Sequence, residues 1–197
     1  MNSHNKFKQN NILKKYNVPN NILIIYGLHS CLSALYNKKR EKLLILTNKK
    51  NFKFWLNQVK KIKSNLKVVP VDEQELNAIS NNNVHQNVLL FSYPLKKITL
   101  DSYLKAKSNL KNKIILLDQV TDPQNVGSII RSAFAFHFNA VGFLKNHAAR
   151  ETPSMIKASS GEIEKVTLIE LKNLSNEIRL LKDNGFYVYG LSNDKKI

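Results

Sequence analysis

The chain has 197 residues, of which 43% are hydrophobic, and its formal net charge is +17. This length suits one large or two small domains, and no apolar run reaches the roughly 18 residues that a membrane span requires. The polar N-terminus does not have the pattern of a secretory signal peptide. The single cysteine, Cys31, excludes an internal disulfide framework, so the reducing cytoplasm is the expected compartment.

The positive charge is unevenly distributed along the chain. Residues 1–113 contain 21 Lys or Arg and 5 Asp or Glu, whereas residues 114–197 contain 10 and 9. The general abundance of Lys and Asn is typical of a genome-wide compositional bias, but such a bias alone would spread the charge evenly. The asymmetry therefore predicts that the first part of the chain faces a polyanion, and it favours nucleic acid over a merely solvated basic surface.

Residues 1–20 are polar and lack periodicity, which is typical of a flexible basic arm. Residues 21–93 then alternate short apolar runs with helical patterns, which predicts a compact α/β domain. The expected strands are 22–27, 42–47, 66–71 and 87–93, and the expected helices are 29–37, 52–62 and one that starts at Asp72 with Glu75 in the position of a capping box. Trp55 is expected in the core rather than as a base-stacking platform, and Cys31 as a buried, inert thiol rather than a nucleophile.

Residues 94–113 are rich in Lys and contain a Pro and one short helical pattern, so they are expected to form a linker. A second α/β unit is expected over residues 114–197. Its expected strands are 114–118, 140–144, 166–171 and 186–191, and its expected helices are 125–137, 153–159 and 174–183. This βαβαβαβ order predicts a parallel sheet with helices on its faces, with fewer strands than doubly wound sheets usually have.

The junction between the first strand and helix of this unit reads DQVTDPQNVGSIIRSA over residues 118–133. Ligands bind open parallel sheets at the carboxyl ends of their strands, but the junction has neither a dinucleotide fingerprint nor a P-loop. In the plainer interpretation Asn125 is only a helix cap, Asp122 belongs to a turn and Arg131 is a surface residue. Against it stands the scarcity of Arg in this Lys-rich chain, since Arg offers phosphate a planar fork.

This stretch resembles the first motif of the SpoU (TrmH-type) RNA ribose 2′-O-methyltransferases of the SPOUT class. That motif is an aspartate, then Asp-Pro-x-Asn-x-Gly, then Ile-x-Arg-x-Ala, and every position is matched here. KASSGEIEKVTLIEL (157–171) and GFYVYGLSND (185–194) resemble later segments of the family, with Glu162 in place of a usual alanine. Upstream, IIYGLHSCLSALYNKKREKLLIL (24–46) resembles the family's small L30e-like substrate-binding domain, and VHQNVL (84–89) resembles its His-Gln-Gly segment, with Asn87 in place of Gly.

The resemblance implies an α/β fold in which a small L30e-like substrate-binding domain precedes a parallel-sheet SPOUT domain, normally trefoil-knotted. It implies S-adenosylmethionine as cofactor, rRNA or tRNA as partner and a homodimer as the assembly of the intact family. Asn125 and Arg131 then become the catalytic residues. The residues implied for RNA binding are Asp122, Arg150, His29, His85 and Gln86, and those for the cofactor are Leu191 and Ser192. His85 is expected to be structural or substrate-orienting rather than a base, and no spacing suggests a metal site.

Two further family motifs, a Gly-x-Glu-Gly-x-Gly loop and a Leu-Asn-Val-Ser segment, do not occur in the chain. These motifs build most of the family's cofactor pocket. The expected protein is therefore the RNA-docking domain with an incomplete SPOUT domain, the product of a truncated or split gene that is inactive alone. A separately encoded C-terminal piece would then be a partner. The alternative is a non-catalytic RNA-binding module.

Overall fold

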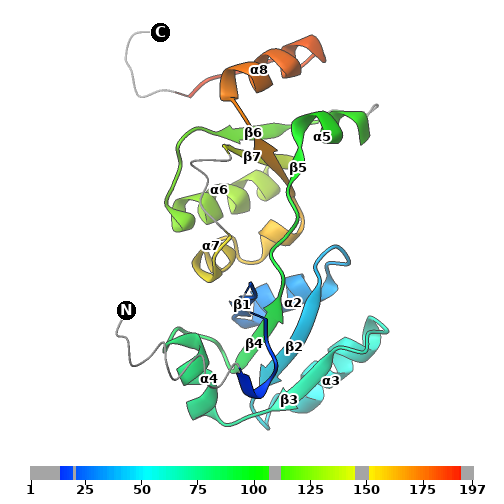
Figure 1. Cartoon of the computed structure of the whole chain (residues 1–197), viewed down its shortest axis with the longest axis vertical. Helices are drawn as coiled ribbons and strands as arrows, with labels where there is room; N and C mark the ends of the chain where they lie inside the picture. The colour runs from blue at the N-terminus through cyan, green and yellow to red at the C-terminus, as the bar shows by residue number, and fades with distance from the viewer. Residues whose placement is uncertain (1–13, 20, 107–111, 145–150, 192–197) are drawn as a thin grey trace.

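The computed structural model describes residues 14–19, 21–106, 112–144 and 151–191. Two sheets lie one above the other along the long axis of the molecule, and helices fill the space between them (Figure 1). The first sheet belongs to the first half of the chain and the second sheet to the second half, as the sequence predicts. None of the described helices is long and apolar enough to cross a membrane.

The first sheet has the strand order β1-β4-β2-β3. β4 pairs antiparallel with β1 and β2, and β2 pairs parallel with β3. Its elements are β1 (Leu23–Tyr26), α2 (Leu28–Tyr36), β2 (Lys42–Thr47), α3 (Phe52–Lys61), β3 (Lys67–Pro70), α4 (Glu73–Ser80) and β4 (Val88–Ser92). Every strand and helix expected over residues 21–93 is present, because alternating apolar runs and helical patterns report burial directly.

The second sheet is parallel throughout, as predicted, with the order β5-β8-β7-β6. Its elements are β5 (Ile98–Thr99), α5 (Leu100–Ala106), β6 (Ile114–Leu117), α6 (Pro123–Ala135), β7 (Ala140–Leu144), α7 (Pro153–Ala158), the 3-10 helix η1 (Glu162–Glu164), β8 (Thr167–Leu171) and α8 (Leu174–Asp183). α8 ends at Asn184 and at Gly185, whose φ of 81° only glycine adopts freely.

Two elements of the second half differ from the prediction. The expected linker contains β5, which pairs with β8, and α5, whose Leu100 and Tyr103 are fully buried against that sheet. Residues 186–191 do not form the expected strand, and Tyr187, Tyr189 and Leu191 lie almost wholly in solvent. The sheet therefore has four described strands, but β5 replaces the expected fourth strand. A two-residue strand carries no periodicity, and a strand needs a neighbouring strand with free backbone groups.

The expected flexible arm lies mostly outside the described residues, but its described part, residues 14–19, packs on the first domain. Tyr16 and Val18 contact the apolar cluster beneath α4. The Tyr16 hydroxyl donates to Glu75 at 2.7 Å, and Lys15 Nζ lies 3.0 Å from the same carboxylate. Glu75 is thus occupied by these partners, and the expected capping box does not form. Asp72 stands at the N-cap of α4 without a side-chain capping bond.

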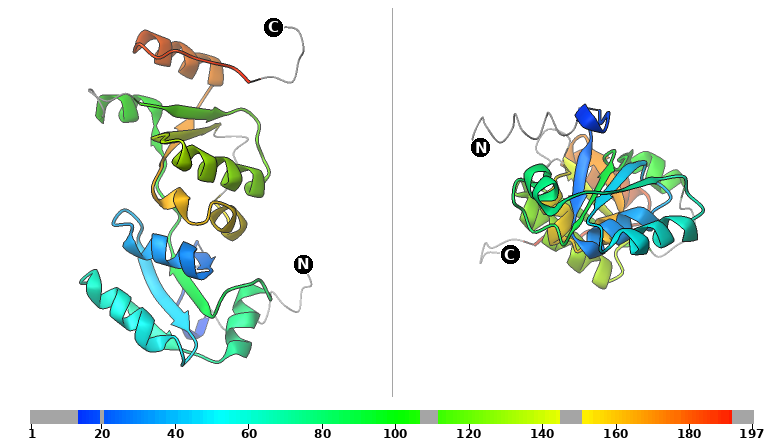
Figure 2. Two further views of the ribbon diagram at one scale, coloured as in Figure 1. Left: turned by 180° about the vertical axis from the view of Figure 1, so that it is seen from behind. Right: turned by 90° about the horizontal axis from the view of Figure 1, so that it is seen from below.

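One apolar cluster spans both halves of the chain. It joins buried residues of α2, α3 and the first sheet to buried residues of α6, α7 and the second sheet, for example Ile25, Cys31 and Trp55 with Val126 and Met155. Figure 2 shows α2, α6 and α7 stacked between the two sheets. The predictions for Trp55 and Cys31 are confirmed, because both are at most 1% exposed and burial raises the pKa of the Cys31 thiol.

A buried charge network reinforces this interface. Arg40, two residues before β2 and 2% exposed, contacts Glu151 and Glu164 of the second half. Arg40 Nε donates to Glu164 Oε2 at 3.0 Å and Arg40 Nη1 to the Tyr93 carbonyl at 3.0 Å. Burial alone would lower the pKa of Arg40, but the hydrogen bonds and charges of Glu164 and Glu151 outweigh burial and raise it. Arg40 is therefore a permanent cation that ties the two halves together.

Candidate active site

The junction that carries the sequence motif is the loop from β6 into α6. Asp122 is the N-cap of α6, and its carboxylate accepts hydrogen bonds from the backbone amides of Gln124 and Asn125 at 3.3 and 3.2 Å. Pro123 occupies the first helical position, where its missing N–H has no cost and its fixed φ favours the helix. The helix thus starts two residues before the sequence predicts, and the two oxygens of Asp122 hold the backbone amides of Gln124 and Asn125, one each.

Both expected catalytic side chains lie on α6 and face solvent. Asn125 is the third residue of the helix, and Arg131 follows six residues later. This separation corresponds to about 9 Å along the axis and about 120° around it, so the long Arg side chain would have to lean towards the N-terminus to meet a group held by Asn125. Within the described part of the chain Arg131 has no hydrogen bond or ion pair, so its guanidinium is available to a ligand.

The glycine of the motif serves packing rather than ligand contact. A Cβ on Gly127 would lie 2.4 Å from the Met155 carbonyl oxygen and 2.7 Å from the Cβ of Ala158, because α6 and α7 cross there. This crossing fixes the start of α6 against α7. A side chain at position 127 would therefore displace α7 and disturb the placement of Asn125.

Replacing Gly127 with Ala is expected to lower the free energy of unfolding by about 1–3 kcal/mol, since the added methyl group overpacks a helix crossing. Chemical denaturation of the two proteins measures the difference. The control is Ser128→Ala, a change at the next, exposed position of the same helix. A Gly127→Ala protein as stable as the control would contradict the close crossing.

The His-Gln segment lies at the N-terminus of α2. The Gln86 side chain accepts from the Leu28 amide at 2.7 Å, and the Gly27 amide donates to the His85 carbonyl at 3.3 Å. His29, in the first turn of α2, is exposed beside this contact. Gln86 and Asn87 have φ of 50° and 59°, a conformation that Gly adopts freely and Asn more readily than most residues, so Asn87 suits its place in this turn.

His85 is buried, and both nitrogens of its ring are in hydrogen-bond contact with neighbouring residues. Its ring is 6% exposed, Nδ1 accepts from the Asn87 amide at 3.0 Å and Nε2 lies 2.9 Å from Asn77 Oδ1. Because Nδ1 accepts, the neutral ring carries its proton on Nε2 and donates it to Asn77. Burial lowers the pKa of His85, which keeps this neutral form dominant near neutral pH. These contacts favour the orienting role over a role as a base.

The remaining expected site residues are not assembled by the described structure. Arg150 and Ser192 lie outside the described residues. Leu191 is completely exposed and packs against no strand. The expected cofactor and RNA-binding residues of the second half are therefore not brought together at the carboxyl ends of β6, β7 and β8 within the described part of the chain. Among the same described residues no cluster of His, Cys, Asp and Glu could hold a metal ion.

Sequence reasoning missed three residues that hold the second half of the chain against the first, namely Arg40, Glu151 and Glu164. Glu151 lies two residues before α7, and its carboxylate accepts from the Leu95 amide at 2.7 Å as well as from Arg40. Glu164 accepts from the Asn37 side chain at 2.7 Å. Arg40 is one of only four Arg in the chain, so the scarcity that drew attention to Arg131 applied equally to it.

Comparison with known proteins agrees with this architecture in both halves. The family model "SpoU rRNA Methylase family" matches residues 112–197, and "RNA 2'-O ribose methyltransferase substrate binding" matches residues 24–97. The matched ranges correspond to the second and the first sheet. The fold class expected from the sequence, a substrate-binding α/β domain followed by a parallel-sheet domain, is therefore confirmed.

The individual relatives are also named as RNA methyltransferases. A Staphylococcus epidermidis protein named for the TrmH family of tRNA/rRNA methyltransferases is 33% identical over 173 residues, which cover 85% of this chain and 68% of the relative. A 23S rRNA (guanosine-2'-O-)-methyltransferase of Blochmanniella floridana is 26% identical over 173 residues, with the same two coverages. The chain spans between 44% and 68% of the length of the curated relatives it matches.

Solved structures show the same fold. The AdoMet-bound rRNA methyltransferase from Sinorhizobium meliloti aligns with a TM-score of 0.66 at 18% identity, over 93% of this chain and 66% of that one. Together with the complete motif on α6 and the two family models, these relatives settle the classification. The chain belongs to the SpoU (TrmH-type) family of RNA methyltransferases.

Proposed function

We propose that the protein acts in the 2′-O-methylation of a ribose in rRNA or tRNA, with S-adenosylmethionine as the methyl donor. The observation that carries this proposal is the start of α6, where Asp122 caps the helix and leaves Asn125 and Arg131 exposed and unpaired by described residues. A ribose hydroxyl is a weak acid, so its proton must leave as the new bond forms. A fixed cation beside the developing alkoxide favours that loss.

In this proposal Arg131 stabilises the developing oxyanion and binds the adjacent phosphate. Its guanidinium stays protonated at neutral pH, so it acts by charge and hydrogen bonding rather than as a base. The Asn125 side chain orients the ribose or its phosphate. Asp122 contributes by capping, because its carboxylate is already used and an anion would repel phosphate.

RNA docking is proposed for the first domain. His29 and Gln86 lie together at the start of α2. Arg150, which belongs to the second half of the chain and lies outside the described residues, is proposed as a further RNA-binding residue. Residues 42–71 contain eight Lys and no Asp or Glu. Seven of these lysines are exposed, on α3, on the turns beside it and at the start of β3: Lys49, Lys50, Lys53, Lys60, Lys61, Lys63 and Lys67.

The chain is expected to bind structured RNA with an affinity that falls at least about tenfold between 50 and 200 mM salt, since phosphate contacts release counterions. Filter binding of bulk tRNA at rising salt measures this. Replacing both Lys53 and Lys60 with Gln is expected to make the salt slope shallower by about 1 to 2. The matched control is Lys182→Gln on α8, and binding that is insensitive to salt would contradict a phosphate-driven mode.

The chain is expected to bind S-adenosylmethionine no more tightly than in the millimolar range, because Leu191 is fully exposed and packs against none of the described strands. Calorimetric titration measures the dissociation constant. Micromolar binding would show that the pocket lies elsewhere in the chain. Tight RNA binding without cofactor binding would favour the alternative of an RNA-binding module for this chain. The homodimer expected for the intact family remains a prediction.

A further inference from the structure

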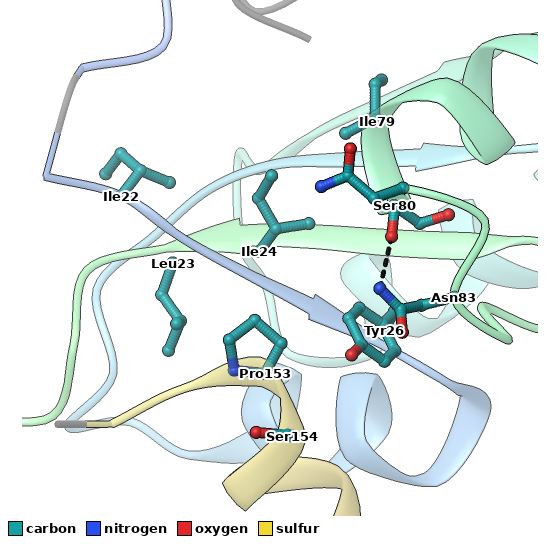
Figure 3. Close-up of a pocket in the computed structure, with 10 residues that line it drawn as sticks. Ile22, Leu23, Ile24, Tyr26, Ile79, Ser80, Asn83, Pro153 and Ser154 are labelled. Carbon is teal, nitrogen blue, oxygen red and sulfur yellow. Dashed lines mark hydrogen bonds between the residues drawn. The ribbon is translucent and has the colours of Figure 1, made fainter. Parts of the chain in front are cut away.

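A pocket of about 420 Å³ lies where the two halves of the chain meet. It is lined by β1 and the residue before it, by the end of α4 with the turn that follows, and by the first turn of α7 (Figure 3). Its volume is in the range of small-molecule sites, about 300–1,000 Å³. None of the residues assigned above to catalysis or RNA docking lines this pocket.

The lining combines apolar walls with polar groups at the edge. Ile24, Ile79 and Pro153 face the space from three different elements (Figure 3). Asn83 Nδ2 donates to the Ser80 carbonyl at 2.6 Å, which fixes the amide and leaves its Oδ1 as an acceptor. Ser154 brings a hydroxyl from α7. Such a combination suits a flat heterocycle that carries N–H donors on its rim.

The surrounding charge favours an anionic ligand. None of the described residues that line the pocket is acidic. Lys157, one turn after Ser154 on α7, places its Nζ 5.8 Å from the centre of the Tyr26 ring, and Tyr26 is itself part of the lining. A phosphate attached to the heterocycle would therefore find a cation at the pocket.

The pocket adjoins the candidate active site through α7. Ser154 directly precedes Met155, whose carbonyl oxygen is the group that a Cβ on Gly127 would strike at 2.4 Å. Gly127 lies two residues after Asn125 on α6. A chain of direct contacts thus runs from the pocket to the helix turn that presents Asn125.

We propose that this pocket binds an unpaired nucleobase of the RNA substrate, from a nucleotide close to the one whose ribose is methylated. The proposal rests on the proposed function, which brings RNA to α6. Proteins that read single-stranded RNA take splayed bases onto apolar surfaces and hydrogen-bond their edges. Here Ile24, Ile79 and Pro153 contact the base faces, the Asn83 amide oxygen accepts from an exocyclic amine, and Lys157 pairs with the phosphate.

The test is an amide NMR titration of the chain with each of the four ribonucleoside 5′-monophosphates, with ribose 5-phosphate as the ligand that lacks a base. The nucleotides that carry an exocyclic amine are expected to shift the signals of Asn83 and Ser154 saturably, and ribose 5-phosphate is not. Asn83→Ala, which removes the accepting oxygen, and Ser154→Trp, which fills the pocket, are expected to weaken binding at least about fivefold. The matched control, Asn176→Ala on the exposed face of α8, is expected to bind like the wild type.

Filter binding of bulk tRNA at low salt separates failure of this proposal from failure of the proposed function. If tRNA binds but the nucleotides leave Asn83 and Ser154 unmoved, or if both variants bind nucleotides as the wild type does, the pocket proposal is wrong and the proposed function stands. If nucleotides fill the pocket but tRNA does not bind, the occupant is a free nucleotide and both proposals are overturned. Because Asn83 is exposed, Asn83→Ala decides the matter even if Ser154→Trp does not fold.

Discussion

Replacing Arg40 with Met is expected to lower the free energy of unfolding by about 3–5 kcal/mol, because the change leaves two buried carboxylates without their cation. The side chains of Glu151 and Glu164 are 5% and 1% exposed, so water cannot replace the guanidinium. A loss of this size is a large part of the roughly 5–15 kcal/mol by which a domain is stable. Denaturant unfolding followed by fluorescence of Trp55 measures it.

The control for this change is Lys39→Met, which removes a neighbouring charge that is exposed. It is expected to alter stability by no more than about 0.5 kcal/mol. Adding Glu151→Gln and Glu164→Gln to the Arg40→Met protein should recover most of the loss, since the buried anions are then neutral. An Arg40→Met protein as stable as the Lys39→Met protein would contradict the buried network.

Replacing Arg131 with Ala is expected to reduce methyl transfer by about 10²–10³-fold, the usual effect of removing one group that stabilises a developing oxyanion. Stability and tRNA affinity should scarcely change, because the side chain is exposed and its proposed task is local to the reacting ribose. The measurement is transfer of labelled methyl groups from S-adenosylmethionine to bulk RNA, in a preparation whose wild-type form is active. Arg131→Lys should retain part of the rate, since it keeps the charge but loses the planar fork.

The matched control is Arg179→Ala, which removes an exposed Arg from α8 and is expected to leave the rate unchanged. If Arg131→Ala lowers RNA affinity as strongly as it lowers the rate, Arg131 is a docking residue and its proposed role in activating the hydroxyl is wrong.

Periodic patterns predicted the elements that bury an apolar face, and they failed where stability comes from a distant partner. α3 was predictable because Trp55 and Val59 share a buried face. β5 was not, since its two residues exist as a strand only because β8 lies beside them. Residues 186–191 have a strand-like composition, yet Tyr187 and Tyr189 are exposed, because no described strand pairs with them. β-propensity expresses packing against neighbours more than a preference of the backbone.

The residues of the candidate site were likewise predictable only where their roles depend on neighbours in the sequence. The motif on α6 is local, so Asp122, Pro123 and Asn125 could be placed on a helix start from sequence alone. The role of Gly127 required the helix that crosses it, 28 residues further along the chain at Met155. The Arg40 network links positions more than 100 residues apart, and no spacing rule connects them.

The apolar cluster shared by the two halves has a consequence for how the protein folds. The two family models divide the chain between residues 97 and 112, but the buried side chains on either side of that division pack against each other. Neither half can unfold without exposing the core face of the other, so we expect the two modules to melt as one cooperative unit in a single transition. A destabilising substitution in the core of the first domain is therefore expected to destabilise α6 as well, although the two family models place these elements in separate modules.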